Sequence, residues 1–208
     1  MRLRTSISVV SVILVATAPS LLAAQASPPP ATEVGAAALA MATVPAKSSA
    51  KIKVSTPAWK DGGDIPFENT QYKGNAFPGL SWSAGPAGTK SYAIIMQDGD
   101  GARNGVPYLH WTMFNVGVST TKLDAGMTAV PAGAQYGQNY KGLNQPYLGP
   151  RTPAGPKHRY HIQIFALDNT MTLDDKATYA DITGAMKDHV LASGELIGLG
   201  QAMTPPSN

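Results

Sequence analysis

The sequence of 208 residues contains no cysteine. This absence excludes disulfide bonds, thiol nucleophiles, cysteine metal ligands and lipid attachment through an N-terminal cysteine. Stability must therefore come from the packed core alone, even if the chain enters a compartment that permits disulfides. The sequence also lacks a Gly-x-Ser-x-Gly nucleophile elbow and a His-Glu-x-x-His zinc motif.

Charged residues are scarce, at 14% of the chain, and the formal net charge is only +3. Arg2 and Arg4 lie in a segment that we expect to be removed, and without them 14 basic residues face 13 acidic ones. A chain so close to neutral carries no electrostatic footprint for nucleic acid. The 21 glycines and 17 prolines are instead typical of a turn-rich β protein.

The first 50 residues differ in composition from the rest. Residues 1–26 have a positive start, an apolar run and the small-x-small triplet Ala24-Gln25-Ala26, which is the pattern of a secretory signal peptide. A membrane anchor is the alternative, but the apolar run is shorter than the about 20 residues that span a bilayer. We therefore expect a periplasmic or secreted protein with no transmembrane span in the mature chain. Residues 27–50, rich in Pro, Ala, Ser and Thr, predict a flexible tether.

Residues 51–208 predict one mainly β domain. Residues 91–97 are almost all apolar, which indicates a strand covered on both faces. Thr178 and Asp181 form a capping-box-like start to a helix predicted over Thr178–Leu191. The run from His158 to Asp168 alternates as a strand does. One face of that strand carries His158, Tyr160, Ile162, Ile164 and Ala166, and the other carries Arg159, His161, Gln163, Phe165 and Leu167.

Unusual polar residues gather where these predicted strands begin or end. Asp98 and Asp100 follow the apolar strand in a Gly-rich stretch predicted to be a loop, His110 begins another strand, and His158 and Tyr160 begin the strand at 158–168. Imidazole and phenol groups donate hydrogen bonds to oxyanions, and a carboxylate orients a histidine or accepts from an ammonium. If the strand ends meet, they form a pocket suited to a small anionic or zwitterionic group.

These residues also have simpler structural interpretations. The sequence Asp98-Gly99-Asp100-Gly101 fits an ordinary turn. A calcium loop is excluded, because Ala102, Arg103 and Leu109 stand where an EF-hand needs a ligand, a glycine and a glutamate.

The remaining histidines do not suggest a metal site. His158 and His161 point to opposite faces of their strand, so joint ligation is not expected, and His161 fits a structural or exposed position. His189 fits the surface of the predicted helix. On the strand at 110–116, alternation places His110 on one face together with Thr112 and Phe114.

Several motifs occur in an order that resembles one known family, the phosphatidylethanolamine-binding proteins, and within it the bacterial branch often called Raf-kinase-inhibitor-like. The motifs are Asp98–Ala102, His110-Trp111 with Asn115, Tyr147–Pro150, Gly155–Tyr160 and Phe165–Asp168, within residues 51–200. The resemblance implies a β-sandwich of two antiparallel sheets in a Greek-key arrangement with a C-terminal helix. It also implies a small pocket for phosphate-like anions or phospholipid head groups. Its positions in this chain are Asp98, Asp100, His110, Pro153, His158 and Tyr160, with Tyr108 as a wall.

Two departures from the family pattern concern this pocket. The family has Asp-Pro-Asp-Ala-Pro where this chain has Asp98-Gly99-Asp100-Gly101-Ala102, so we expect a more mobile loop. Thr152 stands where the first of two adjacent prolines is expected. Both changes bear on the shape of the pocket and on its preferred ligand.

The leading hypothesis is a non-catalytic binding protein without cofactor or metal. Its ligand would be phosphate or a phosphoethanolamine-like group, held by His110 and His158, with Asp98 orienting one imidazole. An alternative is an inhibitor of a protease or another protein partner that acts through the same region. A weak hydrolase using Asp98 and His110 is less favoured, because the sequence places no identifiable nucleophile or metal beside them.

Overall fold

The computed structural model describes residues 35–203. The predicted signal peptide, the first part of the predicted tether (27–34) and residues 204–208 lie outside this range. Within it, no helix is both long enough and apolar enough to cross a membrane.

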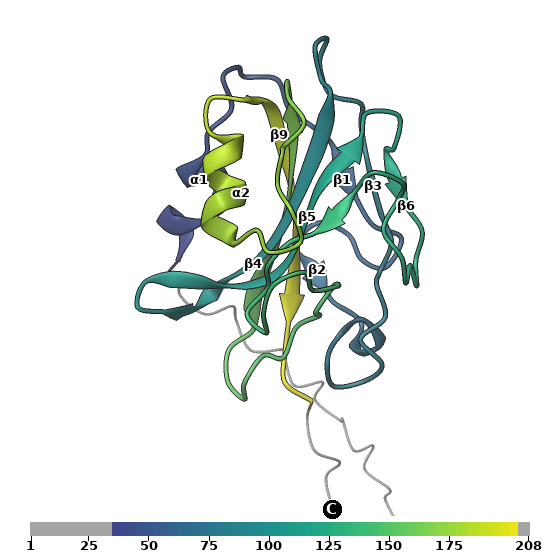
Figure 1. Cartoon of the computed structure of the whole chain (residues 1–208). Coiled ribbons are helices and arrows are strands. Elements are labelled where there is room, and N and C mark those ends of the chain that lie inside the picture. The colour runs from purple at the N-terminus through teal and green to yellow at the C-terminus, as the bar shows by residue number, and fades with distance from the viewer. Residues whose placement is uncertain (1–34, 204–208) are drawn as a thin grey trace, which may run out of the picture.

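Two β-sheets form the fold (Figure 1). The smaller sheet has the strand order β1 (Val54–Ser55), β3 (Leu80–Trp82), β6 (Lys122–Leu123). The larger sheet has the order β2 (Gly63–Asp64), β9 (Val190–Gly200), β8 (His158–Leu167), β4 (Ser91–Arg103), β5 (Val106–Gly117), β7 (Gln135–Tyr136). All pairs of neighbouring strands are antiparallel except β2 and β9, which are parallel. The prediction of a mainly β fold with two sheets is thus confirmed.

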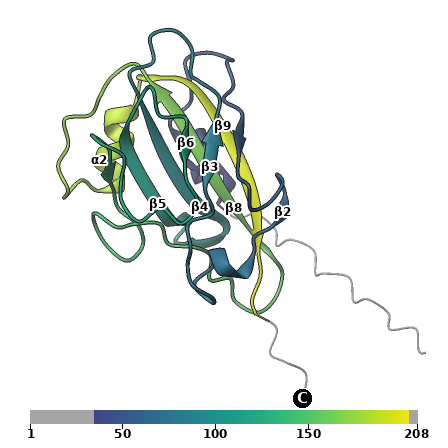
Figure 2. The ribbon, with the colours of Figure 1, turned by 90° about the vertical axis from the view of Figure 1, so that its right-hand side faces the viewer.

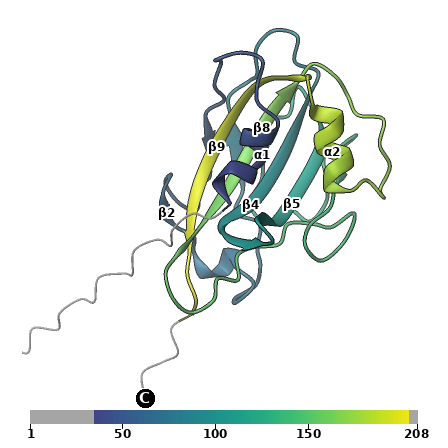
Figure 3. The ribbon, with the colours of Figure 1, turned by 90° about the vertical axis from the view of Figure 1, so that its left-hand side faces the viewer.

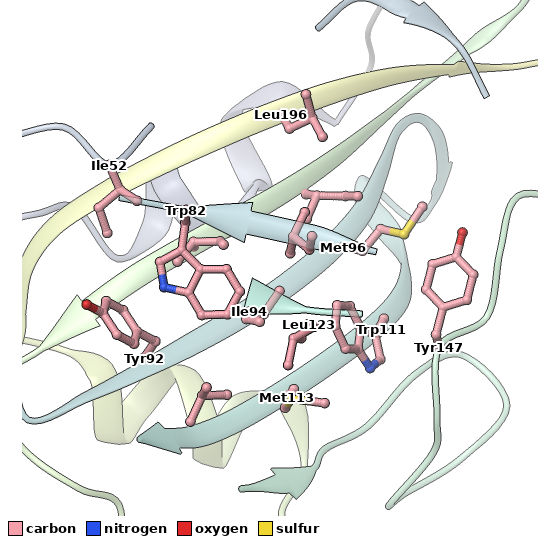
Figure 4. Close-up of a cluster of buried hydrophobic side chains, with 14 of the residues drawn as sticks. Ile52, Trp82, Tyr92, Ile94, Met96, Trp111, Met113, Leu123, Tyr147 and Leu196 are labelled. Carbon is pink, nitrogen blue, oxygen red and sulfur yellow. The ribbon is translucent and has the colours of Figure 1, made fainter. Parts of the chain in front are cut away.

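The larger sheet buries a different set of side chains on each face, as the alternation along β8 predicts. Tyr160, Ile162 and Ile164 belong to the cluster under the small sheet, whereas Phe165 and Leu167 belong to the cluster under the helices. Figure 4 shows Trp82 and Leu123 of the small sheet packed over the β4 and β5 side chains of the first cluster. Figure 2 shows the small sheet lying across the long strands. Burial of each such apolar side chain contributes about 1.5–3 kcal/mol to the free energy of unfolding.

The helix α2 (Tyr179–Met186) begins as predicted but ends early. Thr178 is its N-cap, and the reciprocal hydrogen bonds of a capping box join Thr178 and Asp181. The helix stops at Met186, because Asp188 adopts a positive φ of 62° and turns the chain into β9. Val190, which lies within the predicted helix, is the first residue of that strand. Its apolar character fits either element.

Residues 35–50 pack on the sheet, so the prediction of a flexible tether is wrong for them. They form η1 (Ala36–Ala38) and α1 (Ala40–Thr43) on the helix-covered face, beside α2 (Figure 3). Two glutamines buried in the sheet supply the reason. The side-chain oxygen of Gln97 accepts from the N–H of Ala40 at 2.8 Å, and that of Gln163 accepts from Met41 at 2.8 Å. These acceptors satisfy N–H groups at the start of a helix too short to be stable alone.

The stretch from Asp98 to Gly105, predicted to be a loop, is a bulged hairpin. Strands β4 and β5 continue to Arg103 and Val106, joined by Asn104 and Gly105 with φ values of 55° and 76°. An Asn-Gly pair with positive φ at both positions is a signature of a two-residue hairpin turn. The pairing register shifts between Asp98 and Ala102, which releases this segment from the regular ladder.

Candidate functional site

The site lies where β8, β4 and β5 meet side by side. The strand register pairs Asp98 of β4 with Tyr160 of β8 on one side and with Tyr108 of β5 on the other. His158 precedes Tyr160 by two residues and therefore shares its face of β8. Residues far apart in the sequence thus lie in adjacent rows of one sheet.

A β-bulge brings His110 to the same face. Met96 of β4 pairs with Trp111 and the next residue, Gln97, pairs with Leu109, so His110 is an extra residue in β5. A bulge of this kind re-aims side chains locally. The prediction that His110 shares a face with Phe114 is therefore wrong: the Phe114 ring lies under the helices, whereas His110 contacts Tyr160 with ring centroids 5.0 Å apart.

A cavity of about 340 Å³ opens at this point. It is lined by Asp98, Gly101, Tyr108, His110, Tyr140, Arg151, Pro153, His158 and Tyr160. The structure thus brings together all but one of the predicted site residues. Their role as ligand-binding residues remains a prediction.

Asp98 and His158 form a buried, oriented pair. His158 Nδ1 lies 2.9 Å from Asp98 Oδ2, and Asp98 Oδ1 accepts from the backbone N–H groups of Asp100 at 3.0 Å and Gly101 at 2.7 Å. Only 4% of Asp98 is exposed. The hydrogen bond to Asp98 raises the pKa of His158, against an opposing effect of burial. Because Nδ1 is engaged with the carboxylate, Nε2 is the nitrogen left for a ligand.

The pKa of His110 shifts in the opposite direction from that of His158. Its Nδ1 lies 2.9 Å from the carbonyl of Leu148 and 3.2 Å from that of Gly149, and since carbonyls only accept, Nδ1 carries the proton. Burial lowers the pKa of His110, although the Leu148 carbonyl and the charge of Asp98 act in the other direction. A neutral His110 therefore offers Nε2 as an acceptor, and it donates from that atom only after taking up a second proton.

Tyr160 is a buried lining residue of the cavity. Its hydroxyl lies 3.0 Å from Oγ1 of Thr152, which is fully buried. Thr152, a departure from the family pattern, thus supplies a hydrogen-bond partner that a proline cannot. Burial and the charge of Asp98 raise the pKa of Tyr160, so the phenol keeps its proton.

Asp100 is the predicted site residue that does not line the cavity. Its side chain is fully buried and accepts from Arg159, with Nε at 2.9 Å, Nη2 at 2.6 Å and the backbone N–H at 2.7 Å. This bidentate pair fixes the start of β8 to the bulged segment of β4. Asp100 therefore positions His158 and Asp98.

Three residues that line the cavity are not among the site residues predicted from the sequence, namely Gly101, Tyr140 and Arg151. A Cβ on Gly101 would lie 2.5 Å from Asp98 Oδ2, so glycine permits this close approach where the family pattern has alanine. Tyr140 stands edge-on to His110, with centroids 5.1 Å apart. Arg151 is exposed at the cavity. For Gly101 the sequence does offer a signal. The pair Asn104-Gly105 predicts a two-residue hairpin turn, and Gly101 lies in the strand that leads into it.

The loop that carries Arg151 is braced by a distant segment next to η2 (Phe67–Asn69). The side chain of Gln71 donates to the Gly149 carbonyl at 2.6 Å, and Asn75 accepts from the Gly149 N–H at 2.7 Å. A Cβ on Gly149 would lie 2.2 Å from the Asn69 carbonyl oxygen, so only glycine fits there. These contacts hold the carbonyls that orient His110.

The other two histidines lie outside the cavity. His161 is buried on the opposite face of β8, with Nδ1 2.9 Å from Glu195. His189 lies 2.6 Å from Asp168 near the end of β8. Among the described residues, no group of three or more His, Asp or Glu side chains is arranged to hold a metal ion.

Comparisons with known proteins agree with this architecture. The family model for phosphatidylethanolamine-binding proteins matches residues 55–201. A UPF0098 protein of Methanothermobacter thermautotrophicus is 37% identical over 153 residues, which cover 71% of this chain and 97% of that protein. LppC of Mycobacterium tuberculosis, a protein named as a lipoprotein, is 30% identical over 158 residues, 76% of each chain.

Solved structures show the same fold. Escherichia coli YbcL, described as a member of the mammalian PEBP family, superposes with a TM-score of 0.68 at 26% identity, over 74% of this chain and all of that one. The PEBP homologue CT736 of Chlamydia trachomatis gives a TM-score of 0.65 at 27% identity, over 73% of this chain and 97% of the other. The chain therefore belongs to the phosphatidylethanolamine-binding protein family, as its motifs predicted.

Proposed function

We propose that the protein is an exported, non-catalytic binding protein whose cavity holds a phosphate-like anion, free or as a phospholipid head group. The observation that carries this proposal is the His158–Asp98 pair beside the cavity, at 2.9 Å. An imidazolium whose Nδ1 is engaged by a carboxylate presents Nε2–H to a ligand oxygen. Arg151 adds a second cation at the same cavity.

The two cavity histidines make anion binding depend on protons. The hydrogen bond to Asp98 raises the pKa of His158 and so favours its protonated form, whereas burial lowers the pKa of His110 and favours its neutral form. A phosphate dianion therefore binds best when His110 takes up a proton. A phosphate hydroxyl or the ammonium of phosphoethanolamine instead donates to neutral His110. We expect the affinity for inorganic phosphate to fall as the pH rises through the raised pKa of His158.

The protonation of Tyr160 supports binding over catalysis. Its phenol keeps its proton because burial raises the pKa, and Asp98 already accepts from His158 and two backbone N–H groups. Neither group is therefore prepared to attack a bound ester. Phosphatase activity that persists through repurification and disappears in both His110→Ala and Asp98→Ala would contradict this part of the proposal.

Export is supported by the composition of residues 1–26 and by the relative that is named as a lipoprotein. Signal-peptide cleavage is tested by expressing the full chain in a bacterial host and determining the N-terminus of the periplasmic product. An intact Met1 in a protein confined to the cytoplasm would contradict export.

The binding test is a titration of the purified protein with inorganic phosphate and with phosphoethanolamine, followed through the NMR resonances of the histidine rings. We expect the signals of His110 and His158 to move. We also expect each of the single variants His110→Gln and His158→Gln to lose binding. His189→Gln is the matched control, since His189 lies outside the cavity. Unmoved resonances at both cavity histidines in millimolar ligand would overturn the proposal.

A further inference from the structure

A second hollow adjoins the anion cavity, behind a wall of two tyrosines. This groove, of about 820 Å³, lies between the start of β5, the 138–140 segment and the start of α2. Tyr108 and Tyr140 line both hollows, and their rings stand edge to face with centroids 6.0 Å apart. Val106, Pro107 and Leu109 line its β5 side, and Tyr179 lines its α2 side. A ligand held in the cavity can therefore extend over this wall into the groove.

The groove collects exposed apolar surface that the core does not explain. Among the residues that the structure describes, six large hydrophobic side chains are exposed. Val106, the most exposed at 57%, lines the groove together with Tyr108 and Tyr140. Exposed apolar surface gathered in one place marks a binding site more often than isolated residues do.

The charges around the two hollows favour an anionic occupant. Arg103 lines the groove, Arg151 lines the cavity, and Lys141 Nζ lies 5.2 Å from the ring centroid of Tyr140. In the described part of the chain, Asp98 is the one carboxylate that lines either hollow, and it is engaged with His158. An occupant with an anionic head and an apolar tail matches this distribution.

We propose that the groove binds the alkyl chain of an amphiphilic phosphate monoester whose phosphate occupies the neighbouring cavity. This inference rests on the anion-binding function proposed above and adds the place where the apolar part of the ligand lies. The phosphate bonds to His158 and Arg151, the first methylenes cross the edges of Tyr108 and Tyr140, and the chain lies against Val106 and Leu109. The tyrosine rings suit this crossing because they offer apolar edges beside polar hydroxyls.

The test compares inorganic phosphate with hexyl phosphate, kept below the concentration at which it forms micelles, by calorimetry at pH 6.5. Each buried methylene tightens binding by about fourfold. Because only part of the chain is covered in an open groove, we expect hexyl phosphate to bind about tenfold more tightly than inorganic phosphate. The methyl resonances of Val106 should move with hexyl phosphate and stay in place with inorganic phosphate.

A matched pair of variants locates the chain. Val106→Gln should reduce the preference for hexyl phosphate several-fold, whereas Val118→Gln, at an exposed valine just beyond the end of β5, should leave it unchanged. Equal affinities of the unmodified protein for the two phosphates would overturn this inference and leave anion binding intact. A preference that survives in Val106→Gln would also overturn it, because the chain would then lie elsewhere. Failure of both phosphates to bind would overturn the proposed function together with this inference.

Discussion

An imidazole–carboxylate pair lies at each end of strand β8, and the two pairs differ in their surroundings. At its start, His158 Nδ1 lies 2.9 Å from Asp98. Just beyond its end, His189 Nδ1 lies 2.6 Å from Asp168, which also pairs with Lys47 at 3.0 Å. The shorter of the two contacts is therefore the one that lies far from the cavity.

Burial separates the two pairs more clearly than distance does. The side chain of Asp98 is 6% exposed and its second oxygen accepts two backbone N–H bonds, whereas the side chains of Asp168 and His189 are 31% and 45% exposed. Water competes for the exposed pair, while the buried pair has fixed partners and an adjoining cavity. An Asp–His contact thus becomes a candidate site through its environment.

The largest effect on stability is expected for Arg159, which joins the start of β8 to Asp100 of β4 beside the cavity. Arg159→Ala removes the guanidinium from Asp100 and leaves a fully buried carboxylate with one backbone partner. Breaking a buried ion pair costs about 3 kcal/mol or more of unfolding free energy. Urea denaturation measures this cost, and phosphate affinity should fall as well because the start of β8 loses its anchor.

Arg151→Ala is the control for this prediction. Arg151 is exposed, so its removal should weaken phosphate binding while leaving the free energy of unfolding within about 0.5 kcal/mol of the original. Similar stabilities of the two arginine variants would contradict the positioning role assigned to Asp100 and Arg159.

The next effect in size concerns Gly101. A methyl group there would lie 2.5 Å from Asp98 Oδ2 and 3.2 Å from the Tyr108 ring, so Gly101→Ala should displace the carboxylate from His158. Loss of a hydrogen bond to a charged group weakens phosphate binding by about tenfold or more. The affinity is measured by calorimetry. Gly117→Ala, with no atom near the added methyl group, should leave the affinity unchanged, and equal affinities for both variants would contradict the close packing around Asp98.

Features of this fold that depend on local sequence patterns can be predicted from the sequence. Alternation along residues 158–167 assigns Tyr160 and Phe165 to opposite faces, because a strand buried on both sides still repeats every two residues. The capping box at Thr178 and Asp181 is local and was therefore predictable. The family motifs predict six of the residues that line the cavity, because their order and spacing are read directly from the sequence.

Other features depend on contacts that a local pattern does not encode. The bulge at His110 exists only in the pairing of β5 with β4, so alternation assigned that residue to the wrong face. Residues 35–50 have a tether-like composition, yet the buried amides of Gln97 and Gln163 supply acceptors for their N–H groups. Asp100 resembled a ligand-binding acid because its partner, Arg159, is distant in the sequence.

A smaller effect should separate the two cavity histidines by pH. Asp98 raises the pKa of His158, so protonated His158 stabilises the fold fully below pH 6.5, and this contribution is lost as pH rises through the raised value. Burial lowers the pKa of His110, so neutral His110 favours the fold above pH 6.5, and this contribution is lost as pH falls. Urea denaturation between pH 5 and 9 should show that His158→Gln costs more at low pH and His110→Gln costs more at high pH. Parallel pH profiles for the two variants would contradict the opposite environments.

The smallest effect is expected at the exposed pair. The hydrogen bond from His189, followed by that from Lys47, lowers the pKa of Asp168, and this contribution is present above pH 3.8 and lost as the pH falls through the lowered value. Because exposed ion pairs are screened by water and salt, Asp168→Asn should change the unfolding transition at pH 7 least among these variants, and should leave phosphate affinity unchanged. Thermal denaturation in low and in high salt measures the first quantity, and calorimetry the second. If Asp168→Asn instead weakened phosphate binding as much as Asp98→Asn, the contact itself would matter more than its burial. The distinction between the two ends of β8 would then fail, since Asp168 lies just beyond the end of that strand that is remote from the cavity.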